Sequence, residues 1–162
     1  MKRIALLIVA SGVLCAASAT FAASRGVSCA SATTLASNSS YVSDTSTTTN
    51  WMTSFGPLVS PANDRLYKLT AGTPPMFPIT PTAASYAFAM YLIPSCSDSG
   101  TEPAPTAATA TVGRELNLDG LTPGTVYYIA VTGIAAGGES ANGTVNFSTG
   151  YLPVGLQSFT VD

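Results

Sequence analysis

Histidine is absent from this chain of 162 residues, and charged side chains are scarce. Lys and Arg number 6 and Asp and Glu number 8, so charged residues make up 9% of the chain, against roughly 25% in an average soluble domain. Without an imidazole, the Ser–His–Asp and Cys–His arrangements of hydrolases lose their general base. Nucleic-acid binding and polybasic membrane binding both need clustered Lys and Arg, so the composition excludes both classes.

The chain is rich in small hydroxyl residues and in turn formers instead. Its 19 serines and 22 threonines make up a quarter of the sequence, and 14 glycines and 11 prolines punctuate every stretch. Apolar residues account for 46%, which is enough for a core. Short runs with alternating polarity and no helical period predict an all-β protein, an antiparallel β-sandwich of the jelly-roll or immunoglobulin-like type.

The N-terminus has the order of a secretory signal peptide. Lys2 and Arg3 precede the apolar residues 4–13, and small residues follow. This order predicts a helical signal peptide over residues 1–22, cleaved after Ala22, with Ala19 as the other cleavage site. A retained membrane anchor is the competing interpretation, because residues 4–24 carry no charge. Cleavage implies an exported protein, located outside the cell, on its surface or in the periplasm, with no membrane span left.

The three cysteines indicate whether the protein works in an oxidising compartment. Cys15 leaves with the signal peptide, so Cys29 and Cys96 remain as an even pair. In an exported protein such a pair predicts a disulfide, with two buried thiols as the other possibility. Two cysteines without a histidine do not make a closed zinc site by themselves.

Several runs read as strands of one domain over residues 23–152. Residues 85–93 are apolar on both faces, which predicts a central strand or a strand flanked by an extra layer. The other predicted strands are residues 65–70, 114–118, 126–134, 143–149 and 153–161. The predicted connections are the Ser/Thr-rich residues 43–50, the proline-rich residues 73–81 and the low-complexity residues 101–110.

Residues 153–162 form a separate C-terminal strand or tail in this prediction. The segment carries no Lys or Arg, so as an edge strand it would lack the usual protection against pairing with another chain. Three interpretations stay open: a last edge strand of the sandwich, a donor strand for another subunit, or a sorting segment.

Four motifs occur in a consistent order along the chain. Residues 29–35 read C-x-x-A-x-x-L, and residues 63–69 form a polar turn followed by a strand with a central Tyr-Lys. Residues 90–96 place a cysteine just past a strand, and residues 121–131 read L-x-P-G-T-x-Y-Y-x-x-V. In this order the motifs resemble the bacterial pre-peptidase C-terminal domain, a small secreted β-sandwich.

This resemblance implies a non-catalytic module associated with substrate binding, secretion or maturation of secreted enzymes. Residues 121–127, followed by residues 138–140, are also similar to the second half of a fibronectin type III domain. Trp51 would then stand for the early core tryptophan of that family. A proline–glycine turn leading to an inward tyrosine suits both families, because both re-enter the sandwich at a corner.

We expect no cofactor and no bound metal. Some pre-peptidase C-terminal domains bind calcium, but calcium needs six to eight oxygens, and the acids of this chain have no D-x-D-x-D spacing. We therefore expect the candidate acids to be solvated loop residues, namely Asp44, Asp64, Asp98 and Glu102. We likewise expect three possible catalytic side chains to point outward from strands, namely Lys68, Glu115 and Asp119. The chain is therefore predicted not to be an enzyme.

Aromatic side chains in loops or at strand ends are the candidate contact residues. Such rings stack on sugars or anchor a protein partner, and the candidates are Tyr41, Trp51, Phe55 and Tyr151. The sequence thus predicts a secreted or cell-surface, non-catalytic module that binds an extracellular protein or polysaccharide. The alternative is a structural subunit that assembles through its C-terminal edge strand. The oligomeric state is left open.

Overall fold

The chain folds as an all-β sandwich, as the sequence predicts. The computed structural model describes residues 28–60, 62–72, 78–134 and 142–150, and every helix or strand assigned among them is a strand. The predicted signal peptide (residues 1–22), both predicted cleavage sites, Tyr151 and the predicted tail (residues 153–162) lie outside the described residues. Within the described ranges no helix has the length and apolar character needed to cross a membrane.

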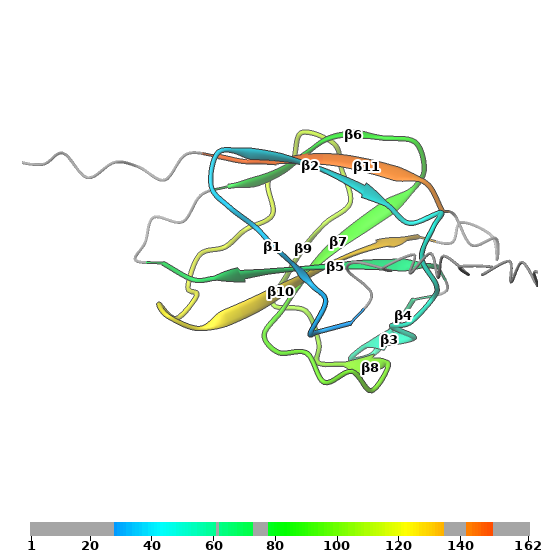
Figure 1. Ribbon diagram of the computed structural model, residues 1–162, viewed down its shortest axis with the longest axis horizontal. Coiled ribbons are helices and arrows are strands. Elements are labelled where there is room, and N and C mark those ends of the chain that lie inside the picture. The colour runs from blue at the N-terminus through cyan, green and yellow to red at the C-terminus, as the bar shows by residue number, and fades with distance from the viewer. Residues whose placement is uncertain (1–27, 61, 73–77, 135–141, 151–162) are drawn as a thin grey trace, which may run out of the picture.

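A five-stranded sheet forms the middle layer of the molecule (Figure 1). Its strands, in spatial order, are β1 (Thr33–Thr34), β5 (Asp64–Thr70), β10 (Val126–Gly133), β7 (Phe88–Ile93) and β9 (Ala107–Thr109). The β5–β10, β10–β7 and β7–β9 pairs are antiparallel, whereas the short β1 runs parallel to β5.

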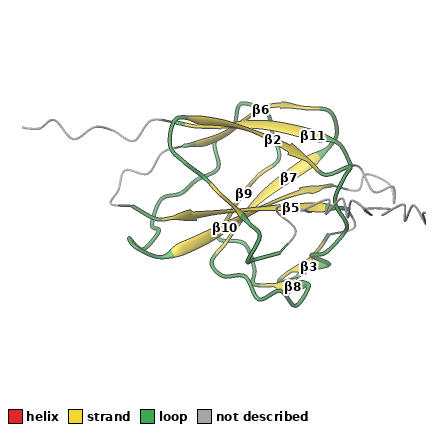
Figure 2. Cartoon of the chain, in the orientation of Figure 1, coloured by secondary structure: helices red, strands yellow, loops and turns green. Residues whose placement is uncertain are grey.

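Two smaller sheets lie on opposite faces of this middle layer (Figures 1 and 2). The upper sheet contains β2 (Ser39–Asp44), β11 (Thr144–Thr149) and β6 (Ile79–Ala84), with β11 in the centre and both pairs antiparallel. The lower sheet contains β4 (Leu58–Val59), β3 (Ser54–Phe55) and β8 (Thr101–Glu102), in that order, with β3 parallel to β8.

Each face of the middle sheet has its own hydrophobic core. Alternate residues of a strand point to opposite faces, so one strand supplies both cores. The core beneath the upper sheet includes Phe88, Met90 and Leu92 of β7, Tyr127, Ile129 and Val131 of β10, and Val145 and Phe147 of β11. The core above the lower sheet includes Met52, Phe55, Leu66, Ile93 and Ala130. The prediction of a central strand, or one flanked by an extra layer, is therefore confirmed for residues 88–93, whereas residues 85–87 precede the strand.

Two predicted segments differ from their expected form. Residues 114–118 are not a strand, although the predicted burial of Leu116 and Leu118 is confirmed. The segment crosses the edge of β6 with one bridge, Leu116 to Ile79, and turns at both ends interrupt it. Residues 101–110 are not a continuous loop, because β8 and β9 lie within them. β8 forms because Phe55 and Glu102, whose side chains are both buried, are paired across β3 and β8.

Pro81 occupies β6, an edge strand of the upper sheet, as the proline content of residues 73–81 predicts. Proline cannot donate a hydrogen bond to a neighbouring strand. The pairing of β6 with β11 shifts register between Asn146 and Phe147, next to this proline.

A disulfide joins Cys29 to Cys96, confirming the predicted pair. Their Cα atoms lie 5.7 Å apart, and the bond closes a loop spanning 67 residues of sequence separation. Cys29 precedes β1 and Cys96 follows β7, so the bond connects the start of the described chain to a segment beside the lower sheet.

A tyrosine corner leads the chain into β10. The Thr125 amide donates to the Thr122 carbonyl at 3.2 Å, and Gly124 between them has φ of 79°. With Pro123 before the glycine, this is the geometry of a type II turn. The Thr122 amide donates to the Tyr127 hydroxyl at 3.1 Å. The tyrosine therefore bonds back to the backbone just upstream, as at the corners of Greek-key sandwiches.

Replacing both bridging cysteines, Cys29→Ser with Cys96→Ser, should lower the free energy of unfolding by roughly 4 kcal/mol, because the closed loop is long. Urea denaturation measures the change. The reduced wild-type chain should show the same loss, and the double variant should not respond to reductant. Equal stability of the oxidised wild type and the double variant would contradict a stabilising role for the bond.

Tyr127→Phe should destabilise the sandwich by about 1–3 kcal/mol, because the Thr122 amide loses its acceptor at the corner. Thermal unfolding followed by circular dichroism checks this value. Tyr128→Phe is the matched control, since that half-buried neighbour faces the opposite side of β10. If the two variants unfold alike, the corner hydrogen bond contributes nothing measurable.

Candidate functional site

The aromatic residues predicted as ligand contacts do not form one platform. Tyr41 packs against the core beneath the upper sheet, with its ring stacked on Phe147 at 5.2 Å and edge-on to Tyr67 at 6.0 Å. Its hydroxyl accepts a hydrogen bond from the Ala36 amide at 2.7 Å. Tyr41 therefore fastens β2 to the core, because its ring points inward from the strand.

The other predicted aromatics belong to the second core or lie outside the described residues. Phe55 is 0% exposed, and its ring lies 5.0 Å from that of Tyr91. The prediction of a ligand contact at Phe55 is therefore wrong, because pairing of β3 with β8 and β4 turns the ring toward the middle sheet. Trp51 is half-buried and packs against the same core. Tyr151 lies outside the described residues.

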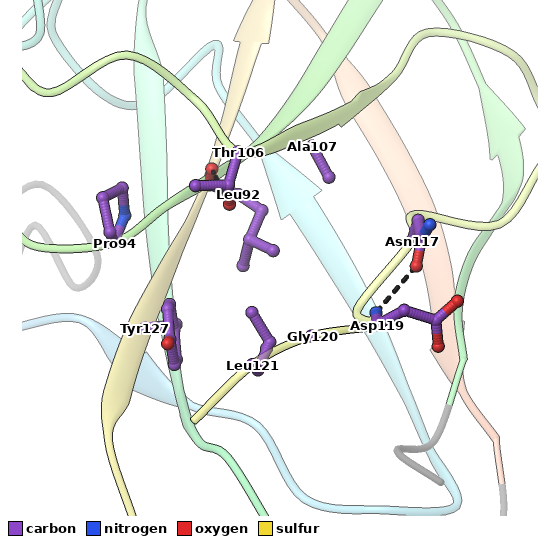
Figure 3. A pocket seen from close by; sticks show the side chains of 9 residues that line it. All are labelled: Leu92, Pro94, Thr106, Ala107, Asn117, Asp119, Gly120, Leu121 and Tyr127. Carbon is purple, nitrogen blue, oxygen red and sulfur yellow. Dashed lines mark hydrogen bonds between the residues drawn. The ribbon is translucent and has the colours of Figure 1, made fainter. Parts of the chain in front are cut away.

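A small cavity lies beside the tyrosine corner (Figure 3). Leu92, Leu121 and Tyr127 provide its apolar wall, and Asn117 and Thr106 lie at its rim. The Asp119 amide donates to Asn117 Oδ1 at 2.7 Å, while the Asp119 carboxylate turns away from the two leucines. The volume of about 210 Å³ is below the ~300–1,000 Å³ of typical small-molecule sites. The cavity suits one side chain or one small group.

A second depression of about 300 Å³ lies along β7 and β9. Its lining contains several alanines, with Tyr91 and Arg114 as the larger side chains. It holds one cationic side chain and no carboxylate, so it brings no acid–base pair together.

Asp64 is buried at the junction of the middle and lower sheets, contrary to the expectation of a solvated acid. Its carboxylate accepts from the Met52 amide at 2.8 Å and from the Ser60 hydroxyl at 3.1 Å. Ser60 Oγ also lies 2.8 Å from Thr132 Oγ1 of β10. Desolvation by burial raises the pKa of Asp64 from 3.8 to about 6, although these hydrogen bonds oppose the rise. The carboxylate holds the chain on both sides of the β3–β4 hairpin against the middle sheet.

Glu102 is also buried, at 1% exposure, so the expectation of a solvated acid is wrong here too. Its carboxylate accepts from the Ser97 amide at 3.0 Å and from the Ser97 hydroxyl at 3.3 Å. A carboxylate oxygen of Glu102 lies within 4.8 Å of the sulfur atoms of Cys29 and Cys96, close enough for the three side chains to be considered as metal ligands. Zinc is bound by thiolates, and these sulfurs are bonded to each other. The arrangement is therefore a buried turn anchor beside a disulfide.

The possible catalytic side chains are not brought together into an acid–base site. Glu115 and Asp119 are exposed, as predicted, and the segment that carries them is not a strand. Lys68 lies on β5 and is half-buried. Asp98 does not belong to an acid–base site either. Its Oδ1 accepts a hydrogen bond from the Cys29 amide at 2.7 Å and so fixes the loop next to the disulfide.

The two edges of the upper sheet differ. The segment after β9 covers the edge of β6, where the Gly113 amide donates to the Pro81 carbonyl at 2.7 Å and the Leu116 amide donates to Ile79 at 2.8 Å. Among the described residues, no strand pairs with the outer edge of β2. This open edge was not predicted from the sequence. Its only local signal is a run without Lys, Arg or Pro over Ser39–Asp44.

Comparison of the chain with protein-family models, with curated proteins and with solved structures finds no match. The resemblance to pre-peptidase C-terminal domains, with fibronectin type III domains as the alternative, remains a prediction from the motifs.

Burial of Asp64 predicts that the chain becomes more stable as the pH falls from about 6 to about 4. The folded carboxyl has a pKa of about 6 against 3.8 ordinarily, so in this window the folded state binds more protons than the unfolded state. This shift corresponds to roughly 3 kcal/mol. Urea denaturation at several pH values measures the slope.

Asp64→Asn should remove this pH dependence, because the amide can still bond Met52 and Ser60 but does not ionise. Asp44→Asn is the control. Hydrogen bonds from Ser46 lower the pKa of Asp44, so its stabilisation is lost only as the pH falls below the ordinary carboxyl range. The same slope between pH 4 and 6 in the wild type and in Asp64→Asn would contradict the assignment.

Proposed function

We propose that this chain is an exported, non-catalytic β-sandwich that works by contact with other proteins outside the cytoplasm, as an assembly subunit. The observation that carries the proposal is the contrast between the two edges of the upper sheet. A loop covers β6, whereas β2 has no strand neighbour on its outer side among the described residues. An edge strand adds an extended partner through main-chain hydrogen bonds.

The character of β2 supports this function. The strand contains no lysine, proline or bulge that would discourage pairing. Val42 at its centre is 65% exposed. Natural sheets usually protect such an edge when it has no partner, so an unprotected edge favours a partner over a bare surface.

Catalysis and sugar stacking have less support. The buried carboxylates of Asp64 and Glu102 bond backbone amides and serine hydroxyls within the fold. Polysaccharide binding by stacking needs exposed rings, and the described candidates Tyr41, Trp51 and Phe55 all pack against the two cores. The disulfide is compatible with an oxidising compartment outside the cytoplasm.

A binding module for an extracellular protein is the second candidate function. The cavity beside Tyr127 favours it, because its apolar wall and polar rim fit a single partner side chain. The motif resemblance to secreted pre-peptidase C-terminal domains agrees with either function, since it points to a module without catalytic activity.

Native protein from fractionated producing cells tests the proposal. Intact mass should show a chain that begins at Ala23 and lacks the two hydrogen atoms of the free thiols. Native gel electrophoresis of the envelope fraction should place the chain in a species well above the mass of one copy.

Two results would overturn the proposal. A reduced chain with an intact N-terminus, found in the cytoplasm, would contradict export. A single soluble copy in the medium, with no larger species in any fraction, would remove assembly and leave the binding module as the surviving function.

A further inference from the structure

We propose that the partner on the open edge of β2 is the β2 strand of a second copy of this chain, paired antiparallel about a two-fold axis at Val42. The inference rests on the proposed assembly function and names its partner. The resulting dimer would join two upper sheets into one continuous six-stranded sheet.

Hydrogen bonds next to β2 fix which of its backbone groups face the open edge. The Thr45 amide donates to the Gly143 carbonyl at 2.8 Å, toward β11. Thr144 bonds instead toward β6, since its carbonyl accepts from the Ser85 amide at 2.9 Å and its amide donates to Ser85 Oγ at 2.9 Å. Because the backbone alternates along a strand, the amides and carbonyls of residues 40, 42 and 44 point to the open edge.

These backbone groups are self-complementary about Val42. A two-fold axis at Val42 places Val42 opposite the second copy's Val42 and Ser40 opposite the second copy's Asp44. Residues 40, 42 and 44 would then all belong to the hydrogen-bonded pairs of an antiparallel ladder. Such an interface uses the same patch on both copies, which is how closed dimers form.

The side chains at these positions agree with the same register. Residues 40, 42 and 44 alternate with the inward Tyr41 and Ser43, so they share the outer face of the sheet. The two exposed valines would cover each other across the axis. Each Asp44 carboxylate would lie opposite a serine hydroxyl that can donate to it, rather than opposite the other carboxylate.

Two contacts limit the length of the shared ladder. Arg65 Nε donates to the Asp44 carbonyl at 3.2 Å, and the Thr47 hydroxyl donates to it at 3.5 Å. A carbonyl oxygen has two lone pairs, so both are already used, and Asp44 would join the ladder through its amide, which would donate to the Ser40 carbonyl of the second copy. Beyond Asp44 the chain turns away, because the Thr48 hydroxyl donates to the Thr45 carbonyl at 3.0 Å. The ladder therefore ends at residue 44.

Sedimentation equilibrium of the oxidised, signal-free chain tests the interface. The wild type should show a concentration-dependent dimer. Val42→Lys should weaken dimerisation at least tenfold, because two like charges would lie directly opposite each other. Val59→Lys is the matched control, since Val59 is 79% exposed on β4 of the lower sheet. Equal melting temperatures of the two variants would establish that both are folded.

A cysteine cross-link tests the register. Val42→Cys should form a disulfide between copies under mild oxidation, because hydrogen-bonded partners have Cα atoms ~5.5 Å apart, within the range of disulfides. Ser40→Cys should not cross-link to itself, since its counterpart would lie roughly 13 Å farther along the strand. Non-reducing mass spectrometry distinguishes the two variants.

A wild-type chain that stays monomeric up to the highest soluble concentration would overturn the inference. So would a dimer that Val59→Lys disrupts and Val42→Lys does not. Oligomers without a cross-link at residue 42 would assign the edge to another occupant, such as residues 151–162, and would also overturn it. In each case a larger native species in the envelope fraction would still support assembly with a different protein.

Discussion

The fold depends on the fact that β10 and β7, at the centre of the middle sheet, are apolar on both faces. A sheet with two apolar faces needs cover on both, and one sandwich partner supplies only one cover. The upper sheet covers Met90 and Ile129, and the lower sheet covers Leu66 and Ile93. The disulfide, Asp64 and Glu102 all lie at the lower sheet, whose strands have two residues each. They hold in place a layer that main-chain pairing alone would hold weakly.

Strong local patterns made the larger strands predictable. The two apolar faces of residues 85–93 predicted a central strand or an extra layer, and the proline–glycine turn before Tyr127 predicted a corner. The burial of Phe55 and Glu102 could not be predicted in this way, because a strand of two residues is too short to show an alternation of polar and apolar residues. Their burial depends on pairing with each other across 47 residues of sequence. In the sequence Asp64 resembles an ordinary acidic residue of a turn. Only the folded chain brings the Met52 amide and the Ser60 hydroxyl to its carboxylate.

The open edge of β2 was unpredictable for a related reason. Strand order determines which strands are edges, and a loop elsewhere in the chain determines which edge is covered. Here residues 113–116 cross β6, about 30 positions after that strand in the sequence. The sequence showed an unguarded segment at the C-terminus, whereas the described residues place an unguarded edge at Ser39–Asp44. Both observations point to strand pairing, on which the proposed assembly function rests, whereas the alternative binding module rests on the cavity beside Tyr127.

The position of the disulfide has a mechanical consequence for a chain pulled by its two ends. Tension entering near Cys29 passes through the sulfur atoms to Cys96 and bypasses the 67-residue span between them. Roughly 220–240 Å of contour length is thereby withheld from extension. β2, β5, β6 and β7 all lie inside the shielded span, whereas β10 and β11 lie outside it. Under load β11 and β10 could unfold and extend, whereas the segment closed by the disulfide could not. The bond therefore sets the maximum length to which the molecule can be stretched.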